Sequence, residues 1–426
     1  MWLIYDLIFL LVALFYLPVY FFKGKFHRGF FMRLGLFPGG LNLNSPLWVH
    51  AVSVGEAMAV RHLIEGLRHL YPGRQIALST VTPTGNKVAA GALSPGDFLF
   101  YLPLDFSFCV KAALKKIQPK ILVIAETEIW PNLITCLYNK HIPIVVVNGR
   151  VSDGSFKGYL WLKFLFRPIL NKVTLFCLQS ENDAGRLIRL GVLPEKIKVT
   201  GNMKFDICDI SDSKKEHMDS GLKVMQGEPG PLFVAGSTHR PEERIILSAY
   251  KKLTREFPSL KLLIAPRHPW RAAEVAALAE RFGFRPLCIS LMDLTNPWRH
   301  ERQAVFILDT IGQLLSFYRL ADIVFVGGSL ARKGGHNMLE PAMWAKPILT
   351  GPFTFNFRDI AELFLENKAA LLVHNEKDIV TGVTDLLCDC SQMSRMGRRA
   401  SELIMQNKGA SAANLMLLAD CLGQEL

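Results

Sequence analysis

The feature that most constrains the fold is an alternation of short β-branched runs with amphipathic stretches, which begins after Pro46 and continues along most of the chain. This alternation is typical of parallel β-strands joined by helical crossovers, because a buried strand reads as a short apolar run and a crossover helix as an amphipathic one. It is interrupted once, by a polar and charged stretch at residues 206–230. The pattern therefore predicts an α/β protein with two doubly wound, Rossmann-like domains in tandem.

The predicted boundaries follow from this alternation and from the apolar N-terminus, and a length of 426 residues suits two domains. The predicted parts are a membrane anchor at 1–22, an N-terminal domain at 23–205, a linker at 206–230 and a C-terminal domain at 231–426. The predicted strands are 47–52, 75–80, 120–125, 142–147 and 174–178 in the first domain, and 232–235, 261–265, 304–308, 323–326 and 347–349 in the second. Helices are expected between them, for example at 56–70 and 108–117. Since ligands of such sheets bind beyond the carboxyl ends of the strands, we expect the active site in the crevice between the domains.

The N-terminus predicts contact with a membrane. Residues 7–22 contain no charge, which is near the lower limit for crossing the hydrocarbon layer. Basic residues follow at 23, 25, 28 and 33, and positive flanks stay on the cytoplasmic side, so we expect the body of the protein in the cytoplasm. The segment either spans the membrane or lies on it as a monotopic anchor, because Asp6 and Pro18 both interrupt an ideal span.

Composition and missing motifs narrow the functional classes. A formal net charge of +12 implies an anionic partner, for which nucleic acid, anionic lipid and phosphorylated substrates all qualify. The eight cysteines are scattered without a CxxC pair, which indicates reduced thiols in a cytosolic compartment. The sequence has no G-x-G-x-x-G, no P-loop, no H-E-x-x-H and no D-x-D, so a dinucleotide oxidoreductase, a P-loop ATPase and a zinc hydrolase all lose support. A transferase without a metal has to stabilise a leaving phosphate with arginine, lysine and helix amides.

The first domain contains three candidate catalytic residues: Glu56 and Glu126 follow predicted strands, and Lys204 lies at the end of the domain. Glu56 stands three residues after Ser53, the spacing of a capping box, and the local sequence favours this structural role. In the functional interpretation, the helix N-terminus keeps Glu56 ionised and able to take a proton from an acceptor hydroxyl. Glu126 follows a strongly apolar strand, where a carboxylate is costly to bury, and we favour it over Glu128, which the start of a helix explains. Lys204 could neutralise a leaving phosphate, although most lone lysines are simply solvated.

Glycine-rich turns in the second domain predict a ligand site. The turn at 234–239 follows a strand and precedes a helix, a geometry whose amides can hold phosphate, and Arg267 offers a planar fork for phosphate or a surface ion pair. The densest cluster comprises Gly327-Gly328-Ser329 and the stretch 334–341. Paired glycines let amides approach a ligand, Asn337 can cap a helix, and Glu340 can accept both ribose hydroxyls. We interpret this cluster as a ligand site.

With these motifs in view, the chain resembles the Kdo transferase family, the 3-deoxy-D-manno-octulosonic acid transferases of lipopolysaccharide synthesis. Several motifs occur in the same order along nearly the whole chain, which makes the resemblance more specific than any one of them. They are HAVSVGE (50–56), LPLD (102–105), ETEIWPN (126–132), NGR (148–150), GNMKFD (201–206), AGSTH (235–239), PRHP (266–269), LDTIG (308–312) and GGHNMLEP (334–341).

The resemblance implies a fold of the glycosyltransferase B type and transfer of Kdo from CMP-Kdo to a lipid A precursor, lipid IVA, at the inner membrane. The reaction would invert the anomeric carbon and need neither a metal nor another cofactor, and no nucleic acid partner is implied. Glu56 would be the general base, and Glu126 and Lys204 would stabilise the transition state. The nucleotide site would be formed by Pro266, Arg267, Ile311, Gly312, Gln313, Asn337, Met338, Leu339 and Glu340. A catalytic Glu56 would have to be free to leave its capping box.

Two alternatives stay open at this point. One is another two-domain transferase or an epimerase that uses a UDP-sugar. The other is a non-catalytic, membrane-tethered protein that binds anionic lipid.

Overall fold

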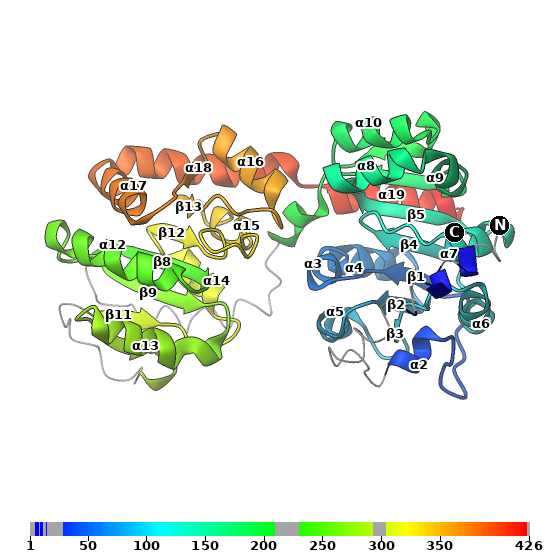
Figure 1. Ribbon diagram of the computed structural model, residues 1–426, viewed down its shortest axis with the longest axis horizontal. Helices are drawn as coiled ribbons and strands as arrows, with labels where there is room; N and C mark the ends of the chain where they lie inside the picture. Colours follow the sequence, from blue (N-terminus) through cyan, green and yellow to red (C-terminus); the bar gives the residue numbers. More distant parts are fainter. Residues whose placement is uncertain are drawn as a thin grey trace. The chain divides into compact units, whose positions relative to one another are not determined.

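The computed structural model describes residues 5–7, 9–11, 14, 29–208, 230–292 and 304–423. The chain forms two compact units, each with its own parallel sheet between layers of helices (Figure 1). The first unit comprises Met1–Ile207 together with Asn407–Leu426, and the second comprises Cys208–Gln406. This architecture confirms the predicted α/β fold with two parallel-sheet domains.

Each unit has a seven-stranded sheet in which the described pairs are parallel. The first sheet has the order β3-β2-β1-β4-β5-β6-β7. Its strands are β1 (Leu47–His50), β2 (Ile76–Thr80), β3 (Phe98–Tyr101), β4 (Ile121–Ala125), β5 (Ile144–Gly149), β6 (Leu175–Leu178) and β7 (Ile197–Val199). The second sheet has the order β10-β11-β9-β8-β12-β13-β14. Its strands are β8 (Leu232–Thr238), β9 (Lys261–Pro266), β10 (Arg285–Cys288), β11 (Ala304–Ile307), β12 (Ile323–Val326), β13 (Ile348–Thr350) and β14 (Ala370–Leu372).

Helices connect these strands on both faces of each sheet (Figure 1). In the first unit they are α2 (Phe30–Arg33), α3 (Val54–Ala59), α4 (Arg61–Leu70), α5 (Pro83–Ala89), α6 (Ser107–Ile117), α7 (Pro131–Asn139), α8 (Asp153–Trp161), α9 (Lys163–Leu170), α10 (Glu181–Leu190) and α19 (Ala410–Leu422). The second unit has α12 (Glu242–Glu256), α13 (Ala272–Arg281), α14 (Leu314–Leu320), α15 (Leu339–Ala342), α16 (Arg358–Glu366), α17 (Glu376–Cys388) and nearly all of α18 (Cys390–Asn407).

The interior strands are buried on both faces, which explains why they read as continuous apolar runs. In β1 the side chains alternate between two cores: Trp48 packs in the cluster with Phe100 and Leu122, while Leu47 and Val49 pack in the other. All ten predicted strands are present. The four strands that the sequence analysis missed, β3, β7, β10 and β14, are the edge strands of the two sheets.

Each sheet reverses its strand order at one point, and this point locates the candidate sites. In the first unit this point lies between β1 and β4: the strands that follow β1 are added on one side of the sheet, and those that follow β4 on the other. In the second unit it lies between β8 and β12. Loops diverge at such a switch point and leave room for a ligand at the carboxyl ends of the strands. The motifs that begin at His50 and Glu126 follow β1 and β4, and those around Ser237 and Gly327 follow β8 and β12.

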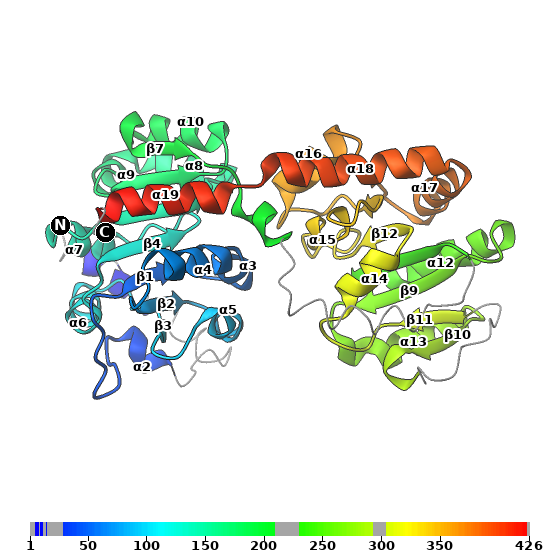
Figure 2. The same cartoon turned by 180° about the vertical axis from the view of Figure 1, so that it is seen from behind.

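The C-terminal boundary differs from the prediction. Helix α19 packs on α4 and β5 of the first unit, so the prediction that the second domain extends to residue 426 is wrong (Figure 2). Ala410 and Leu418 are buried in the same core cluster as Val49. Asp206, predicted to begin the linker, belongs to this junction, since its carboxylate accepts bonds from the amides of Gly409 (2.8 Å) and Ser411 (2.6 Å). Residues 209–229 of the predicted linker lie outside the described residues.

Most of the predicted anchor, residues 1–22, also lies outside the described residues. Within the part of the chain that the structure describes, no helix combines the length and the apolar character needed to cross a membrane. The described anchor residues are helical and docked on the first unit. Asp6 accepts bonds from the Ser107 amide (3.0 Å) and the Asn132 side chain (2.7 Å), and the Phe9 ring lies edge-on against Phe106. Asp6 therefore fixes the start of the N-terminal segment to the first turns of α6 and α7.

Candidate functional site

Glu56 lies in the first turn of α3 and forms the predicted capping interaction. Its backbone amide donates to Ser53 Oγ, and the Ser53 hydroxyl donates to Glu56 Oε1 at 2.8 Å. The Val52 amide donates to Glu56 Oε2 at 2.7 Å. A carboxylate offers about four lone-pair positions, and these bonds occupy two of them. The carboxylate therefore retains capacity to accept a proton without leaving the cap, which removes the conflict between the two roles of Glu56.

Glu126 and Lys204 form an ion pair, with Lys204 Nζ 3.3 Å from Glu126 Oε1. The Glu126 amide continues the ladder to Val147, but its φ of 57° places the residue in the left-handed region. A non-glycine residue held there costs about 1 kcal/mol or more, and such residues concentrate at functional sites. The backbone thus turns sharply at the end of β4 and presents the Glu126 carboxylate to Lys204.

Lys204 is held in place by a residue of the neighbouring strand. It belongs to the short 3-10 helix η3 (Met203–Cys208), and its amide bonds to Asn202 Oδ1. Asn148, at the end of β5 with a φ of 53°, accepts the Met203 amide at 2.9 Å. The predicted NGR motif therefore anchors the segment that contains Lys204.

Glu128 joins this group, although the sequence analysis explained it as an acid near a helix start. Burial, followed by the charges of Glu56 and Glu126, raises the pKa of Glu128 to about 7. Burial also raises the pKa of Glu56, with a further contribution from Glu126, whereas Ser53, Val52 and Lys204 oppose the rise. The carboxyl end of the first switch point thus gathers three carboxyl groups and one lysine, which we call the carboxylate cluster (Glu56, Glu126, Glu128 and Lys204).

In the second unit, Glu242 fills the amide cradle that the sequence analysis reserved for a ligand. Its carboxylate accepts bonds at 2.8–3.2 Å from five backbone amides, namely those of His239, Gly328, Ser329, Leu330 and Ala331. The side chain is fully buried. The interpretation of Gly327-Gly328-Ser329 as a ligand cradle is therefore wrong for these amides. Packing explains the glycine at position 327, because a Cβ there would lie 2.5 Å from the Ser237 carbonyl oxygen.

The predicted nucleotide residues lie at the carboxyl edge of the second sheet. Pro266 ends β9, and the exposed Arg267 follows it, with its amide bonded to the Thr238 carbonyl. The predicted turn at 311–313 follows β11, which is the neighbour of β9. Ile311 is 87% exposed, so its side chain is available to a ligand.

The predicted phosphate and ribose residues begin α15. Asn337 Oδ1 accepts the Leu339 amide at 3.1 Å, and Asn337 Nδ2 donates to Glu340 Oε1 at 3.2 Å. Met338 and Leu339 are buried, so only their backbone can face a ligand. Tyr318 is also buried here, and its hydroxyl oxygen lies 2.0 Å from where a Cβ of Gly236 would be. Gly236 in the predicted turn therefore makes room for Tyr318.

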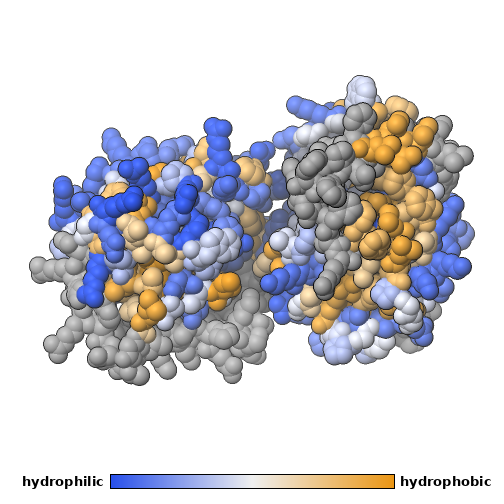
Figure 3. Space-filling view, turned by 60° about the horizontal axis from the view of Figure 1, so that its bottom comes forward, coloured by the Kyte–Doolittle hydropathy of each residue, from blue (hydrophilic) through white to orange (hydrophobic). Residues whose placement is uncertain are grey.

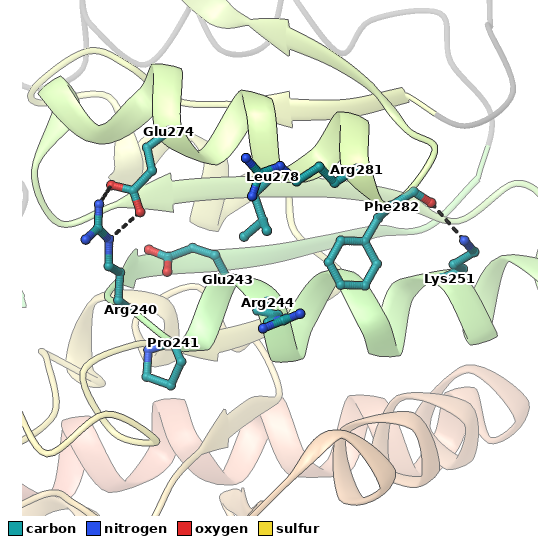
Figure 4. A pocket seen from close by; sticks show the side chains of 9 residues that line it. All are labelled: Arg240, Pro241, Glu243, Arg244, Lys251, Glu274, Leu278, Arg281 and Phe282. Atoms are coloured by element: carbon teal, nitrogen blue, oxygen red, sulfur yellow. Dashed lines mark hydrogen bonds and ion pairs between the residues drawn. The ribbon is translucent and has the colours of Figure 1, made fainter.

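A cavity of about 520 Å³ lies behind this edge, between α12 and α13 (Figure 4). It is lined by Arg240, Pro241, Glu243, Arg244, Lys251, Glu274, Leu278, Arg281 and Phe282. An ion-pair chain closes one end: Arg240 binds Glu274, Glu274 binds Arg271 at 3.0 Å, and Arg271 binds Glu243 at 2.7 Å. The chain fixes Arg271 beside the end of β8.

The structure thus brings Glu56, Glu126 and Lys204 together in one unit and places the predicted nucleotide residues along one sheet edge of the other. The sequence analysis missed Glu128, Glu242 and two histidines of this edge, His239 and His336, whose Nε2 atoms are 2.9 Å apart. Of these, Glu128 had a signal in the sequence, since two carboxylates after a buried strand were already noted.

Sequence comparisons identify relatives of this chain. A family model described as 3-Deoxy-D-manno-octulosonic-acid transferase (kdotransferase) matches residues 28–207. The 3-deoxy-D-manno-octulosonic acid transferase of Haemophilus influenzae is 35% identical over 373 residues, which cover 87% of this chain and 86% of that protein.

Solved structures share the fold. The UDP-GlcNAc 2-epimerase of Neisseria meningitidis has a TM-score of 0.62 at 13% identity and covers 88% of this chain and 99% of its own. A glycosyltransferase of Rickettsia africae has a TM-score of 0.56 at 14% identity, and the match covers 90% of this chain and 100% of that protein. At these identities the likeness shows the fold alone, which is common to transferases and epimerases.

Replacing Glu242 with Gln should loosen the loop after β12. The amide NH₂ of Gln would face backbone N–H donors, so we expect the amides of 328–331 to exchange hydrogen at least about ten-fold faster, a loss of about 1–3 kcal/mol. Hydrogen exchange measured by mass spectrometry checks this. Glu256→Gln, an exposed position on the same helix, is the control. Unchanged protection in Glu242→Gln would contradict the role of the carboxylate.

Glu128 should make stability depend on pH. Its folded pKa of about 7 lies above the ordinary 4.5, so its contribution to stability is present below pH 4.5 and is lost as the pH rises through 7. Glu128→Gln removes this loss. We expect the free energy of unfolding of the variant to exceed that of the wild type by about 1–2 kcal/mol at pH 8, after solvent screening, and by less at pH 5.

Thermal melts of the two proteins across this pH range measure the difference. Glu181→Gln, at the exposed start of α10, is the control, and its difference from the wild type should not change between pH 5 and pH 8. A difference between Glu128→Gln and the wild type that stays constant with pH would show that Glu128 is ionised throughout.

Proposed function

Because the chain belongs to the family of 3-deoxy-D-manno-octulosonic acid (Kdo) transferases, we propose that it transfers Kdo from CMP-Kdo to a lipid A precursor, without a metal ion. The family membership decides between the classes that the sequence left open, since it favours a transferase over an epimerase and over a non-catalytic binding protein. The observation that supports the chemistry is the carboxylate cluster, in which the candidate base lies beside an ion pair of opposite charges.

In the proposed reaction, Glu56 accepts the proton of an acceptor hydroxyl as the hydroxyl oxygen attacks the anomeric carbon of Kdo. The bond from that carbon to the phosphate oxygen breaks, CMP leaves with the electron pair, and the configuration inverts. A base works best when its pKa lies near the working pH. The raised pKa of Glu56, caused by burial and then by Glu126, moves it in that direction.

The remaining predicted residues would stabilise charge in the transition state and hold the CMP part of the donor in position. Lys204, paired with Glu126, provides positive charge next to the base and stabilises the transition state. Arg267 is exposed at the strand end with a planar fork suited to the phosphate of CMP. Asn337 and Glu340, which share a hydrogen bond at the start of α15, would bind the phosphate and the ribose hydroxyls.

Membrane association is proposed from the N-terminal segment. Leu7, Leu10, Leu11 and Leu14 recur at the spacing of one helix face, and each is 45–59% exposed. Figure 3 shows apolar side chains gathered on one face of the first unit. An exposed leucine stripe followed by basic residues is typical of a helix in contact with an anionic lipid surface. We place the enzyme on the cytoplasmic side of the inner membrane, where an acceptor lipid would be available.

Glu56→Gln should lower turnover strongly and spare donor binding. The amide keeps the size of the side chain and cannot take a proton, so we expect kcat to fall at least about 10²-fold while CMP still raises the melting temperature. Turnover is measured with CMP-Kdo generated in situ and lipid IVA, and Glu65→Gln is the matched control. Near wild-type turnover in Glu56→Gln would remove it from the role of base.

Mass spectrometry of the lipid product in the same assay tests the function itself. The mass gained by lipid IVA shows whether Kdo is added and how many units are added. The reaction should proceed in EDTA, and CMP should protect the protein from thermal unfolding where UDP does not. Protection by UDP alone, without transfer of Kdo, would contradict the proposal.

A further inference from the structure

Two histidines at the switch point of the second sheet share a hydrogen bond. His239 follows β8, His336 precedes α15, and their Nε2 atoms are 2.9 Å apart. A bond between two ring nitrogens needs one N–H and one lone pair, so a single proton lies between them. The neutral pair therefore leaves one Nδ1 without a proton, on the ring that donates.

The backbone holds this pair in place. His336 packs on Gly328, where a Cβ would lie 2.9 Å from His336 Cδ2 and where φ is 72°. Gly335, with φ of 73°, donates its amide to the Gly328 carbonyl at 2.9 Å. On the other side, the His239 amide is bound by the buried Glu242. Both imidazoles are thus attached to loops that the fold fixes.

The charges that face the pair are mostly positive. The groups that act on His239 are His268, Glu243, Lys333 and Arg271, and those that act on His336 are His239, Arg267 and His268. The one carboxylate among them, Glu243, is held by Arg271 at 2.7 Å and by the Thr238 hydroxyl at 3.0 Å. Because the pKa of His268 is itself lowered, the cationic groups near the rings are Arg267, Lys333 and Arg271, and Arg271 is paired with Glu243.

This environment keeps the pair neutral. Burial, followed by His239, Arg267 and His268, lowers the pKa of His336 to about 4. Burial also lowers the pKa of His239, with His268 as the next cause. An anion placed between these groups would reverse the electrostatic part of both shifts, because it favours the charged form of a nearby imidazole.

We propose that His239 and His336 form an anion-binding pair that takes up one proton from solvent when the phosphate of the donor nucleotide binds at this sheet edge. The proposal rests on the proposed function, because the ligand is its CMP donor. Only bonds to hydrogen change: the buffer acid or water loses a proton, an N–H bond forms at the unprotonated Nδ1, and the pair becomes a monocation that shares its central proton. The pair would then favour a phosphate-bearing nucleotide over the neutral nucleoside.

The competing explanation is structural. In it, the hydrogen bond only ties the loop after β8 to the loop before α15, and the pair stays neutral with or without ligand. The two explanations differ in the number of protons exchanged on binding, which calorimetry measures directly.

The test is titration calorimetry of CMP into the full-length protein at pH 7, in two buffers with different heats of ionisation. On binding CMP, the wild type should gain as much as about one proton more than His336→Gln, because the ring at position 336 is absent from the variant and cannot be charged. The difference between the two proteins cancels the titration of CMP itself. His374→Gln, an exposed histidine of the same unit, should match the wild type, and cytidine should cause no uptake.

Nitrogen-15 spectra of the histidine rings in the wild type give a second readout that does not depend on a variant. CMP should convert one ring of the pair to the charged form. CMP binding with equal proton exchange in the wild type and His336→Gln, or with ring signals that stay neutral, overturns the proposal and leaves the proposed function intact. A wild type that does not bind CMP would instead refute the proposed function, and the pair with it.

Discussion

The pairing of β1 with β4 in the first sheet is the constraint on which the catalytic assignment depends. The register from Leu47 opposite Ile121 to His50 opposite Ile124 brings the two strands to the same level at their carboxyl ends. The chain then departs in opposite directions, into α3 on one side and toward α7 on the other. Glu56 and Glu126, 70 positions apart in the sequence, become neighbours for this reason alone.

This arrangement has an energetic cost. Three carboxyl groups share one lysine, and burial together with the neighbouring carboxylates raises the pKa of Glu56 and of Glu128. Glu126 adds a left-handed backbone conformation. Strain and raised pKa values at one strand end are features that a purely structural sheet edge does not need, and they are typical of sites that move protons. In the second unit, the buried carboxylate at the sheet edge is stabilised by the backbone, because Glu242 accepts hydrogen bonds from five amides.

The sequence predicted the parts of the fold that burial dictates. Interior strands such as β4 are covered on both faces and give continuous apolar runs, whereas edge strands such as β10 and β14 are short and partly exposed, so their pattern is weak. The return of α19 to the first unit left no local signal, since its apolar face would suit either domain. The glycines at 327 and 328 looked like a ligand cradle because the sequence does not show that a distant carboxylate, Glu242, fills it. The roles of Glu56, Glu126 and Lys204 came from the resemblance to the Kdo transferases, and only the fold shows that they are neighbours.

We propose that the ion pair of Glu126 and Lys204 acts as one unit beside Glu56, the proposed base. A double-mutant cycle on turnover, with Glu126→Gln, Lys204→Met and both together, measures this coupling. If the ion pair acts as a unit, the double variant should be about as slow as the slower single variant, because either change already removes the unit. Losses that multiply in the double variant would show that the two residues act independently and would contradict the account of the carboxylate cluster.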